Sequence, residues 1–586
     1  MRIAVVKADH CQPRRCSYEC QNFCPGVRTG EETVVVDEKT GRPRINEDLC
    51  SGCGICVRKC PLHAISVVNL PSELEGKCVH RYMPNGFALY GLPIPRKGSV
   101  IGLVGKNGMG KTTALQILSR VLRPNLGRTE GTTPQDLIEF FRGSELQAYF
   151  REIEKVRLIY KPQGVDAIPR IMGGTVKEVM ERVDERGLAG ELISELELEE
   201  ALGRRLEELS GGELQRLAIA AAAAREGEVY YFDEPSSHLD VYQRLRSARV
   251  IRKLAEEGKA VMVVEHDLAA LDYVCDGIHV VYGQPGVYGV VASPQGVRTG
   301  INSFLDGYLK AENVRFRREP IRFDVRPLLK QAGEGRKIFE YPNLKMVYPG
   351  FELEVSPGFL CSGEIVGVVG PNAIGKTTFV RMLAGELEPS EGRIERALTI
   401  SHKPQYPERR EGVDVRSYLL SVVGSFDELF EPEIAGPLDL SRLMDRRMEE
   451  LSGGELQRVA IAGCLGRAAD LYLLDEPSAY LDAEERLHVA RVIRRVVEKR
   501  ESCGLVVDHD ILCIDMVSDR LLVFSGIPGK RGTARGPLDM RSGINIFLGQ
   551  IGITFRRDPQ TGRPRANKPG SALDREQRER GEYFYL

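Results

Sequence analysis

The octapeptide LSGGELQR occurs twice in this chain, at residues 209–216 and 451–458, and each copy lies between a glycine-rich loop and a DEPS sequence. The loops are GKNGMGKTT, at residues 105–113, and GPNAIGKTT, at residues 370–378. Both fit the pattern G-x-x-x-x-G-K-[ST] after a run of apolar, mostly β-branched residues, so each predicts a strand, a phosphate-binding loop and a helix. An isolated match could be a tight structural turn, but two copies of the same ordered motifs predict two complete nucleotide-binding domains.

The two loops have the composition that phosphate binding requires. Their glycines allow backbone N–H groups to converge on the phosphates, the lysine neutralises the β- and γ-phosphate charge, and the next hydroxyl ligates magnesium. The expected ATP and Mg²⁺ ligands are Gly105, Asn107, Gly108, Gly110, Lys111, Thr112 and Thr113 in the first domain, and Gly370, Asn372, Gly375, Lys376, Thr377 and Thr378 in the second.

Downstream motifs supply the groups that hydrolysis needs. VYYFDE places Asp233 at the end of an apolar strand with Glu234 just after it, and LYLLDE does the same with Asp475 and Glu476. We expect the aspartates to hold magnesium through water and the glutamates to orient the attacking water as general bases. Residues that follow other strands complete each predicted site: Gln163 and His266 in the first, Gln405 and His509 in the second.

Eight of the 14 cysteines fall within the first 60 residues. Cys50-x2-Cys53-x2-Cys56-x3-Cys60-Pro61 matches the bacterial ferredoxin run, in which three thiolates hold one iron–sulfur cluster and the fourth reaches its neighbour. A looser copy, Cys11-x4-Cys16-x3-Cys20-x3-Cys24-Pro25, lies upstream. By that crossover, one 4Fe-4S cluster takes Cys11, Cys16, Cys20 and Cys60, and the other takes Cys24, Cys50, Cys53 and Cys56.

Zinc or disulfides are the alternative interpretations of these cysteines. Zinc loops seldom carry this triple spacing with a terminal Cys-Pro, and a cytosolic ATPase does not keep disulfides. The other six cysteines stand singly among apolar neighbours and are expected in the core: Cys78, Cys275, Cys361, Cys464, Cys503 and Cys513.

The first nucleotide-binding domain carries an insertion. Gln163 lies 53 residues after Gly110, whereas Gln405 lies only 30 residues after Gly375. Apolar spacing over residues 134–155 predicts helix, turn and helix in the extra stretch. A packing embellishment is the alternative interpretation, but the absence of the insertion from the second domain favours a one-sided docking element.

The motifs predict five consecutive parts: a cluster domain over 1–75 with a hairpin in TVVVDEKTGRPRIN, a first nucleotide domain over 76–297, a hinge over 298–328, a second nucleotide domain over 329–540, and a second hinge with a tail over 541–586. The hinge is itself repeated, because RTGINSF at residue 298 recurs as RSGINIF at residue 541. Basic hinge residues are predicted to hold the nucleotide domains together, with RNA contact and a solvated linker as equal alternatives for their exposed charge: Arg315, Arg317, Arg318, Arg556 and Arg557.

Composition limits the choice of partner and compartment. A formal net charge of −2 means that any nucleic-acid contact must come from local basic patches. The longest apolar stretches, such as residues 217–224, are far shorter than the roughly 18 residues that a membrane span needs. No signal peptide is visible, so a cytoplasmic protein without transport activity of its own is expected.

These motifs closely resemble those of the ATP-binding-cassette (ABC) ATPases, which the Ser-Gly-Gly signature distinguishes among phosphate-loop proteins. The resemblance implies an α/β fold in which two cassettes of one chain face head to tail, with each ATP between one phosphate loop and the opposite signature. Site one would then combine Lys111, Gln163, Glu234 and His266 with Ser452, Gly453 and Gly454, and site two would combine Lys376, Gln405, Glu476 and His509 with Ser210, Gly211 and Gly212. Aromatic candidates for stacking on adenine are Tyr82 or Phe87 and Tyr341 or Phe351.

With the cysteine runs added, the whole chain resembles subfamily E, the RNase L inhibitor family, which splits ribosomes for recycling in archaea and eukaryotes. The resemblance implies a monomer with two structural clusters whose domain swings when the cassettes close. It implies as partners the ribosome, through small-subunit rRNA and ribosomal proteins, a release factor or its paralogue, and initiation factors. The two halves differ at two equivalent positions. His238 in the first half corresponds to Tyr480 in the second, and Glu265 corresponds to Asp508. Equal hydrolysis rates at the two sites are therefore not expected.

Two other functions compete with a ribosome-splitting ATPase. The clusters would permit ATP-gated electron transfer, although no flavin or dinucleotide fingerprint marks an electron acceptor. A DNA-repair or transport cassette is disfavoured, because neither a long heptad coiled coil nor a membrane span interrupts the motifs.

Overall fold

A computed structural model describes residues 2–8, 10–128, 131–323, 335–394 and 398–584. The chain forms two compact units, one comprising Met1–Ser237, Arg249–His266 and Val274–Pro320, the other His238–Ala248, Asp267–Tyr273 and Ile321–Leu586. The predicted boundary between the first hinge and the second nucleotide domain, at residues 328 and 329, lies outside the described residues. Within the described part of the chain, none of the helices has the length and apolar character that a bilayer crossing requires.

The N-terminal part is built from two small antiparallel strand pairs and three short helices. β1 (Arg2–Val6) pairs with β4 (Ile65–Asn69), and β2 (Val34–Val36) pairs with β3 (Pro43–Ile45), which confirms the predicted hairpin. The helices are α1 (Glu19–Asn22), α2 (Pro25–Arg28) and α3 (Ile55–Lys59). Ala4, Val34, Ile45 and Ile65 form a small core beside Cys20, so little apolar surface is buried here apart from the cysteines.

A buried polar contact ties this part to the first cassette. The Asn85 side chain donates to the carbonyls of Ala4 and Ile45, each at 3.0 Å, and accepts from the Ile45 N–H at 2.8 Å. Arg81, at the end of β5 (Cys78–Arg81), forms an ion pair with Glu47. Both contacts lie within the first unit, so the segment from Arg81 to Asn85 holds strands of the cluster domain.

The first cassette contains a parallel three-stranded sheet of β10 (Ala260–Val264), β9 (Val229–Asp233) and β8 (Leu158–Lys161). β7 (Ser99–Val104) runs parallel to β11 (Gly277–Gln284), which continues into antiparallel pairing with β12 (Tyr288–Val291). The principal helices are α4 (Lys111–Leu118), α8 (Val176–Val183), α10 (Gly211–Ala224), α11 (Val241–Glu256) and α12 (Leu268–Val274).

The insertion of the first cassette is a helix pair, as predicted. α5 (Pro134–Phe140) and α6 (Glu145–Glu152) are joined by a short turn, and Thr133 caps α5 through a reciprocal hydrogen bond with Asp136. The rings of Phe141 and Phe150 stack at 5.1 Å and join the same apolar core as α4, β9 and β10. The inner face of the insertion is therefore part of the cassette core, and its outer face remains exposed.

The second cassette has one eight-stranded sheet, in the order β17-β18-β25-β24-β20-β23-β22-β21. Its strands are β17 (Leu344–Tyr348), β18 (Phe351–Val355), β25 (Arg531–Asp539), β24 (Arg520–Ile527), β20 (Ile365–Val369), β23 (Cys503–Val507), β22 (Leu471–Asp475) and β21 (Ile400–Lys403). Along β22, Tyr472 and Leu474 enter one core while Leu471 and Leu473 enter the other. The sheet is thus buried on both faces, as its continuous apolar strands require.

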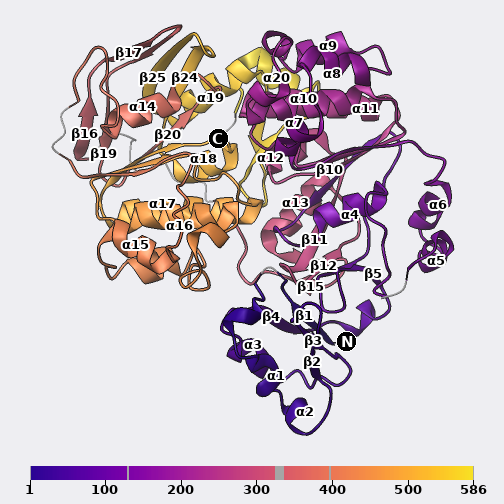
Figure 1. Ribbon diagram of the computed structural model, residues 1–586. Coiled ribbons are helices and arrows are strands. Elements are labelled where there is room, and N and C mark those ends of the chain that lie inside the picture. The colour runs from indigo at the N-terminus through magenta and orange to yellow at the C-terminus, as the bar shows by residue number, and fades with distance from the viewer. Residues whose placement is uncertain (1, 9, 129–130, 324–334, 395–397, 585–586) are drawn as a thin grey trace. The chain divides into compact units, whose positions relative to one another are not determined.

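Helices cover the two faces of this sheet unequally. α15 (Val415–Val423), α16 (Gly453–Gly466) and α17 (Ala483–Lys499) pack together in one core (Figure 1). α14 (Lys376–Leu383) joins the core on the other side, together with β16 (Lys337–Tyr341). The phosphate-loop helix and the signature helix therefore lie on opposite faces of the sheet.

The repeated hinge segments fold alike. α13 (Val297–Asp306) is followed by the strand pair β14 (Tyr308–Leu309) and β15 (Val314–Arg315). α19 (Met540–Ile551) is followed by β26 (Phe555–Arg557) and β27 (Pro564–Ala566), and the chain then forms α20 (Ala572–Arg580). The sequence repeat is therefore a repeat of a helix and a hairpin.

Candidate nucleotide and iron–sulfur sites

Both phosphate loops join a strand to a helix, as predicted. The glycines before each helix, Gly110 and Gly375, have φ values of +84° and +102°, a conformation that side chains rarely adopt. Lys111 Nζ donates to the carbonyls of Gly105 and Lys106, both at 2.8 Å, so the lysine is folded over its own loop. Lys376 contacts the carbonyls of Gly370 and Pro371 in the same way. Each lysine ammonium is therefore buried at its own loop, where it could neutralise the charge of a bound phosphate.

The aspartates at the ends of β9 and β22 are suited to a cation. Asp233 and Asp475 are almost wholly buried, and burial raises the pKa of each carboxyl. Among the described residues, Asp233 Oδ1 and both carboxylate oxygens of Asp475 have no hydrogen-bond partner. Buried oxygens of this kind, beside the hydroxyl-bearing Thr112 and Thr377 positions, fit the oxygen ligands that magnesium prefers.

The glutamates that follow these aspartates, Glu234 and Glu476, lie close to the predicted histidines. Glu234 Oε1 lies 3.1 Å from His266 Nε2, and Glu476 Oε1 lies 3.4 Å from His509 Nε2 and accepts from Gln405 Nε2 at 2.8 Å. Burial alone would raise the pKa of Glu234, but the nearby His266 and Lys111 lower it to about 2. The pKa of Glu476 is also lowered to about 2, against burial, by His509 and Gln405. Both carboxylates are therefore ionised at neutral pH and able to accept a hydrogen bond from water.

The backbone of both glutamates is strained. Glu234 has a φ of +45° and Glu476 a φ of +48°, which places two side-chain-bearing residues in the left-handed region. Such a conformation costs about 1–3 kcal/mol and persists only where surrounding contacts enforce it. The backbone N–H of Glu234 donates to the Val264 carbonyl at 3.0 Å, and that of Glu476 donates to the Val507 carbonyl at 2.8 Å.

Carboxylates next to the histidines differ between the halves. The Glu265 carboxylate accepts from the backbone N–H of its neighbour His266 at 2.7 Å. The shorter Asp508 accepts instead from the Ser478 hydroxyl at 2.6 Å and from the Asp510 N–H at 2.9 Å. The substitution noted in the sequence thus changes the hydrogen bonds that hold each histidine loop.

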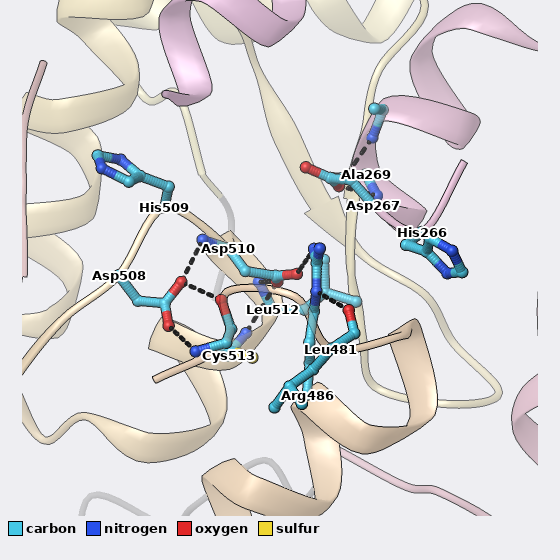
Figure 2. A network of polar contacts seen from close by, with 12 residues as sticks. His266, Asp267, Ala269, Leu481, Arg486, Asp508, His509, Asp510, Leu512 and Cys513 are labelled. Atoms are coloured by element: carbon cyan, nitrogen blue, oxygen red, sulfur yellow. Dashed lines mark hydrogen bonds and ion pairs between the residues drawn. The ribbon is translucent and has the colours of Figure 1, made fainter. Parts of the chain in front are cut away.

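A charged network follows the second histidine (Figure 2). Asp510 caps α18 (Ile511–Val517) through the N–H groups of Leu512 and Cys513, at 2.9 and 3.1 Å. Arg486 donates to Asp510 at 3.1 Å and to the Leu481 carbonyl at 2.9 Å. Within the same unit, Asp240 accepts from the backbone N–H of Asn372 in the second phosphate loop, at 2.7 Å.

The signature motifs open helices. α10 begins at Gly211 and α16 at Gly453, as predicted, and the Ser210 and Ser452 hydroxyls cap them in reciprocal bonds with Glu213 and Glu455. Their first-turn N–H groups and dipoles make such helix ends favourable for an anionic phosphate. The pairing of each signature with the opposite phosphate loop stays a prediction.

The aromatic candidates fall into two groups. A Cβ added at Gly110 would lie 2.8 Å from the Phe87 ring, and one added at Gly375 would lie 3.1 Å from the Phe351 ring, so both rings lie against the phosphate loops. The Tyr82 hydroxyl lies 3.2 Å from the Thr113 hydroxyl. Tyr341, in contrast, is 3% exposed and packs against Phe379, because it shares the buried face of β16 with Phe339. Tyr341 therefore cannot offer a ring face to a nucleotide.

The eight N-terminal cysteines line two separate hollows. One is lined by Cys24, Cys50, Cys53 and Cys56, and the other by Cys11, Cys16, Cys20 and Cys60. The structure thus gathers the two four-thiol sets that the ferredoxin crossover predicts, and four thiols are the donor set of a 4Fe-4S cluster. Burial raises the pKa of Cys20 to about 12 and that of Cys56 to about 11, so a cluster would displace protons on binding. Of the other six cysteines, five are buried as expected, whereas Cys78 is only half-buried.

The hinge arginines have different contacts: Arg557 reaches α18 of the second cassette, whereas Arg315 and Arg317 contact their own segment. Arg557 forms a bidentate ion pair with Asp515, with N–O distances of 2.5 and 2.7 Å. Arg317 donates to the Leu305 carbonyl at 2.9 Å, and the Arg315 guanidinium lies over the Tyr308 ring. Arg315 and Arg318 are exposed, which leaves their charge available at the surface.

Sequence reasoning missed four buried side chains beside the glutamates. Lys161 and Lys403 end β8 and β21, and Gln215 and Gln457 lie in the signature helices. All four contact the backbone of the Asp-Glu pairs. The available signal was the repeat itself, since KPQ and LSGGELQR both occur twice.

Comparison with known families agrees with this architecture. The ABC transporter family model matches residues 95–237 and 359–479. A model described as "Possible Fer4-like domain in RNase L inhibitor, RLI" matches residues 1–32, and a 4Fe-4S binding domain model matches residues 43–66. The fold and sites thus define an ABC-type ATPase with two cassettes and an N-terminal iron–sulfur domain.

Relatives that match over the full length of the chain identify the family within this class. The chain is 51% identical to an uncharacterized ABC transporter ATP-binding protein of Methanocaldococcus jannaschii, over 100% of this chain and 98% of the relative. It is 45% identical to translation initiation factor RLI1 of Saccharomyces cerevisiae and to ABC transporter E family member 1 of Arabidopsis thaliana, again over 100% of this chain and 98% and 99% of theirs. The chain belongs to the RNase L inhibitor family, the E family of ABC proteins.

Two solved structures agree with this family assignment. A chain in a structure described as ribosome-bound archaeal Pelota and ABCE1 is 55% identical, with a TM-score of 0.92 over 100% of this chain and 99% of that one. A chain in the complex of archaeal ribosomal stalk protein aP1 with the archaeal ribosome recycling factor aABCE1 is also 55% identical, with a TM-score of 0.85 over 88% of this chain and 100% of that one.

Proposed function

We propose that this protein is a cytoplasmic ATPase that couples ATP binding and hydrolysis to the splitting of ribosomes into subunits. The observation that carries the proposal is its full-length match, at 55% identity, to a chain in a ribosome-bound archaeal complex. The naming of the yeast relative as a translation initiation factor supports a further link to initiation. Ribosomal rRNA and proteins, a release factor or its paralogue, and initiation factors are the proposed partners.

The geometry supports hydrolysis at both cassettes. In each, the loop lysine would neutralise the β- and γ-phosphates, and Glu234 or Glu476 would accept a hydrogen bond from the attacking water and then its proton. His266 and His509 lie against these carboxylates, where they can orient them and contact the γ-phosphate. Magnesium, when bound through Asp233 or Asp475 and the loop threonines, would neutralise charge that develops on the phosphate oxygens.

The cysteine sets are proposed to hold two 4Fe-4S clusters with a structural role. The small apolar core of this domain makes the clusters the main cross-links between its loops. The contacts of Arg81 and Asn85 join that domain to the segment that carries Tyr82 and ends at Phe87, beside the phosphate loop. A movement of the phosphate loop on ATP binding would therefore be transmitted to the cluster domain through this segment.

The direct test is sedimentation of purified ribosomes through a sucrose gradient after incubation with the protein and ATP, with and without a release factor. We expect the intact particle to separate into subunits only when protein, ATP and factor are all present. The matched control is the Lys111→Ala, Lys376→Ala double variant, which removes both loop ammonium groups. Ribosomes that remain intact with the parental protein, or that separate equally with the double variant, would contradict the proposal. A reversible change in the cluster spectrum during turnover would instead favour electron transfer.

A further inference from the structure

The backbone carbonyl oxygens of Glu234 and Glu476 each accept hydrogen bonds from two buried side chains, a lysine and a glutamine. Neither side chain has a part in the hydrolytic chemistry described above. In the first cassette, Gln215 Nε2 donates to the Glu234 carbonyl at 2.7 Å. Lys161 Nζ lies 3.4 Å from the same oxygen and 3.0 Å from the Asp233 carbonyl. The end of β8 and the second turn of the signature helix α10 therefore meet at one peptide group.

The second cassette repeats this arrangement. Gln457 Nε2 donates to the Glu476 carbonyl at 2.7 Å, and Lys403 Nζ donates to it at 3.2 Å. Lys403 Nζ also donates to the Asp475 carbonyl at 2.7 Å. The same two residue types thus hold the same peptide group in both cassettes, at equivalent positions of the repeated KPQ and LSGGELQR motifs.

Burial makes these contacts costly to maintain. Lys161 is 2% exposed and Lys403 1%, while Gln215 and Gln457 are fully buried. Among the described residues, the amide oxygens of both glutamines have no hydrogen-bond partner, so each amide is a donor to the glutamate carbonyl alone. Buried lysines and amides are unfavourable unless they are hydrogen-bonded, so apolar residues would suit these positions better if packing were their only role.

The strained backbone explains what the contacts achieve. Glu234 and Glu476 have positive φ values, and relaxation to the ordinary region would rotate the peptide group that follows each of them. The N–H of each glutamate is bonded to β10 or β23, and its carbonyl is bonded to the lysine and the glutamine. With both ends of the residue fixed, the direction of its side chain is fixed as well.

We propose that Lys161 with Gln215, and Lys403 with Gln457, are positioning residues for ATP hydrolysis, which hold the left-handed backbone of Glu234 and Glu476 so that each carboxylate stays directed at the attacking water. The proposal rests on the ATPase activity proposed above. Because Gln215 and Gln457 stand on the signature helices, it also links the signature of each cassette to the glutamate of that same cassette.

The test isolates one site at a time. In a Glu476→Gln background, which leaves site one as the active site, Lys161→Met and Gln215→Met remove the donors while keeping an unbranched apolar chain of similar length. We expect kcat to fall at least tenfold with each change, while KM for ATP changes less than threefold. That split identifies an interaction needed in the transition state and not in ground-state binding. Lys177→Met, on the exposed face of α8, is the matched control and should leave both constants unchanged.

A second comparison separates positioning from a general loss of structure. With Glu476→Gln kept so that site two stays impaired, adding Lys161→Met to Glu234→Gln should cause no further fall in the residual hydrolysis rate, because the carboxylate that it positions is already absent. Lys403→Met and Gln457→Met, tested in a Glu234→Gln background, should repeat the pattern at site two. The proposal is overturned if kcat is unchanged in both Lys161→Met and Gln215→Met, if KM rises in proportion to any loss, or if the effects of Lys161→Met and Glu234→Gln multiply. Absence of hydrolysis in the parental protein would instead contradict the ATPase assignment.

Discussion

The hydroxyl of Tyr149 on α6 lies 2.5 Å from the hydroxyl of Tyr231 on β9 and donates to the Leu118 carbonyl at the end of α4, at 2.6 Å. The insertion thereby contacts both the strand that carries Asp233 and the phosphate-loop helix. In the second cassette, which has no insertion, Leu473 occupies the position of Tyr231. A hydroxyl therefore appears at this position of the strand only in the cassette where the insertion needs an anchor.

Tyr149→Phe should loosen the insertion, because it leaves the Leu118 carbonyl without a donor and the Tyr231 hydroxyl without an acceptor. Such a loss costs about 1–3 kcal/mol. Hydrogen exchange of α5 and α6 amides should accelerate accordingly, while α15 in the second cassette should be unaffected. The Tyr149→Phe, Tyr231→Phe double variant should be less impaired than the sum of the single changes. Unchanged exchange in Tyr149→Phe would show that the hydroxyl pair does not anchor the insertion.

Loss of the exposed face of the insertion should abolish ribosome stimulation and spare the basal ATPase. Deletion of residues 134–155 would also uncover core contacts of Phe141 and Phe150, so a surface change is the sharper experiment. We expect Arg142→Glu with Arg151→Glu, both exposed, to reduce ribosome-stimulated hydrolysis several-fold without altering the rate of the protein alone. Equal reduction of both rates would place the effect inside the cassette.

Glu234→Gln and Glu476→Gln should each retain ATP binding and impair hydrolysis at their own site. Loss of a positioned general base should slow that site by about a hundredfold or more, since the phosphate loop is untouched. Single-turnover measurements with each variant would resolve the two sites, and whole-protein turnover is expected to respond unequally because Glu265 and Asp508 hold their histidine loops differently. Parental rates at the altered site would remove the glutamate from catalysis.

The two kinds of hinge arginine should respond differently to charge reversal. Arg557→Glu would place a carboxylate against Asp515, whose side chain is 6% exposed, and should destabilise the second unit by about 3–5 kcal/mol. Adding Asp515→Arg should restore part of that stability in thermal unfolding. Arg318→Glu, at an exposed position, should leave stability unchanged and weaken ribosome binding with a smaller dependence on salt. If Arg318→Glu does not change the affinity for ribosomes, Arg318 does not contact the ribosome and is a solvated charge of the linker.

Cys24→Ser or Cys53→Ser should lose cluster iron and unfold the N-terminal loops, while ATP binding and basal hydrolysis persist because the proposed nucleotide ligands lie beyond residue 80. Such variants should fail to separate ribosomal subunits. Cys78→Ser is the matched control, since Cys78 lines neither hollow, and it should keep its iron. Splitting at full rate by an iron-free variant would contradict a structural role for the clusters in that step.

The strands, loops and helix starts of both cassettes could be predicted because local pattern determines them. Apolar runs such as SVIGLV predict buried strands, and Ser210 and Ser452 before their glycines predict helix starts. The cysteine sets followed in the same way from spacing, since the ferredoxin run carries its own crossover.

Side-chain direction could not be predicted in the same way. A lysine at the end of an apolar strand ordinarily turns to solvent, yet Lys161 turns inward to a peptide that is 72 residues away in the chain. The burial of Tyr341 depends on which face of β16 meets α14, and a five-residue strand does not specify that face. The sequence VYYFDE does not distinguish Tyr231 from the other apolar residues of the strand, because the role of its hydroxyl depends on how the insertion packs against it.

The division of the cysteines between the two hollows also constrains how the domain can be made. Each proposed ligand set draws on both runs, so a nascent chain that ends before residue 50 holds neither complete set. Cys56 completes one set and Cys60 completes the other, only four residues later. Delivery of iron and sulfide during synthesis would therefore have to wait for almost the whole domain, and the two clusters would become insertable nearly together, as a single late event in biogenesis.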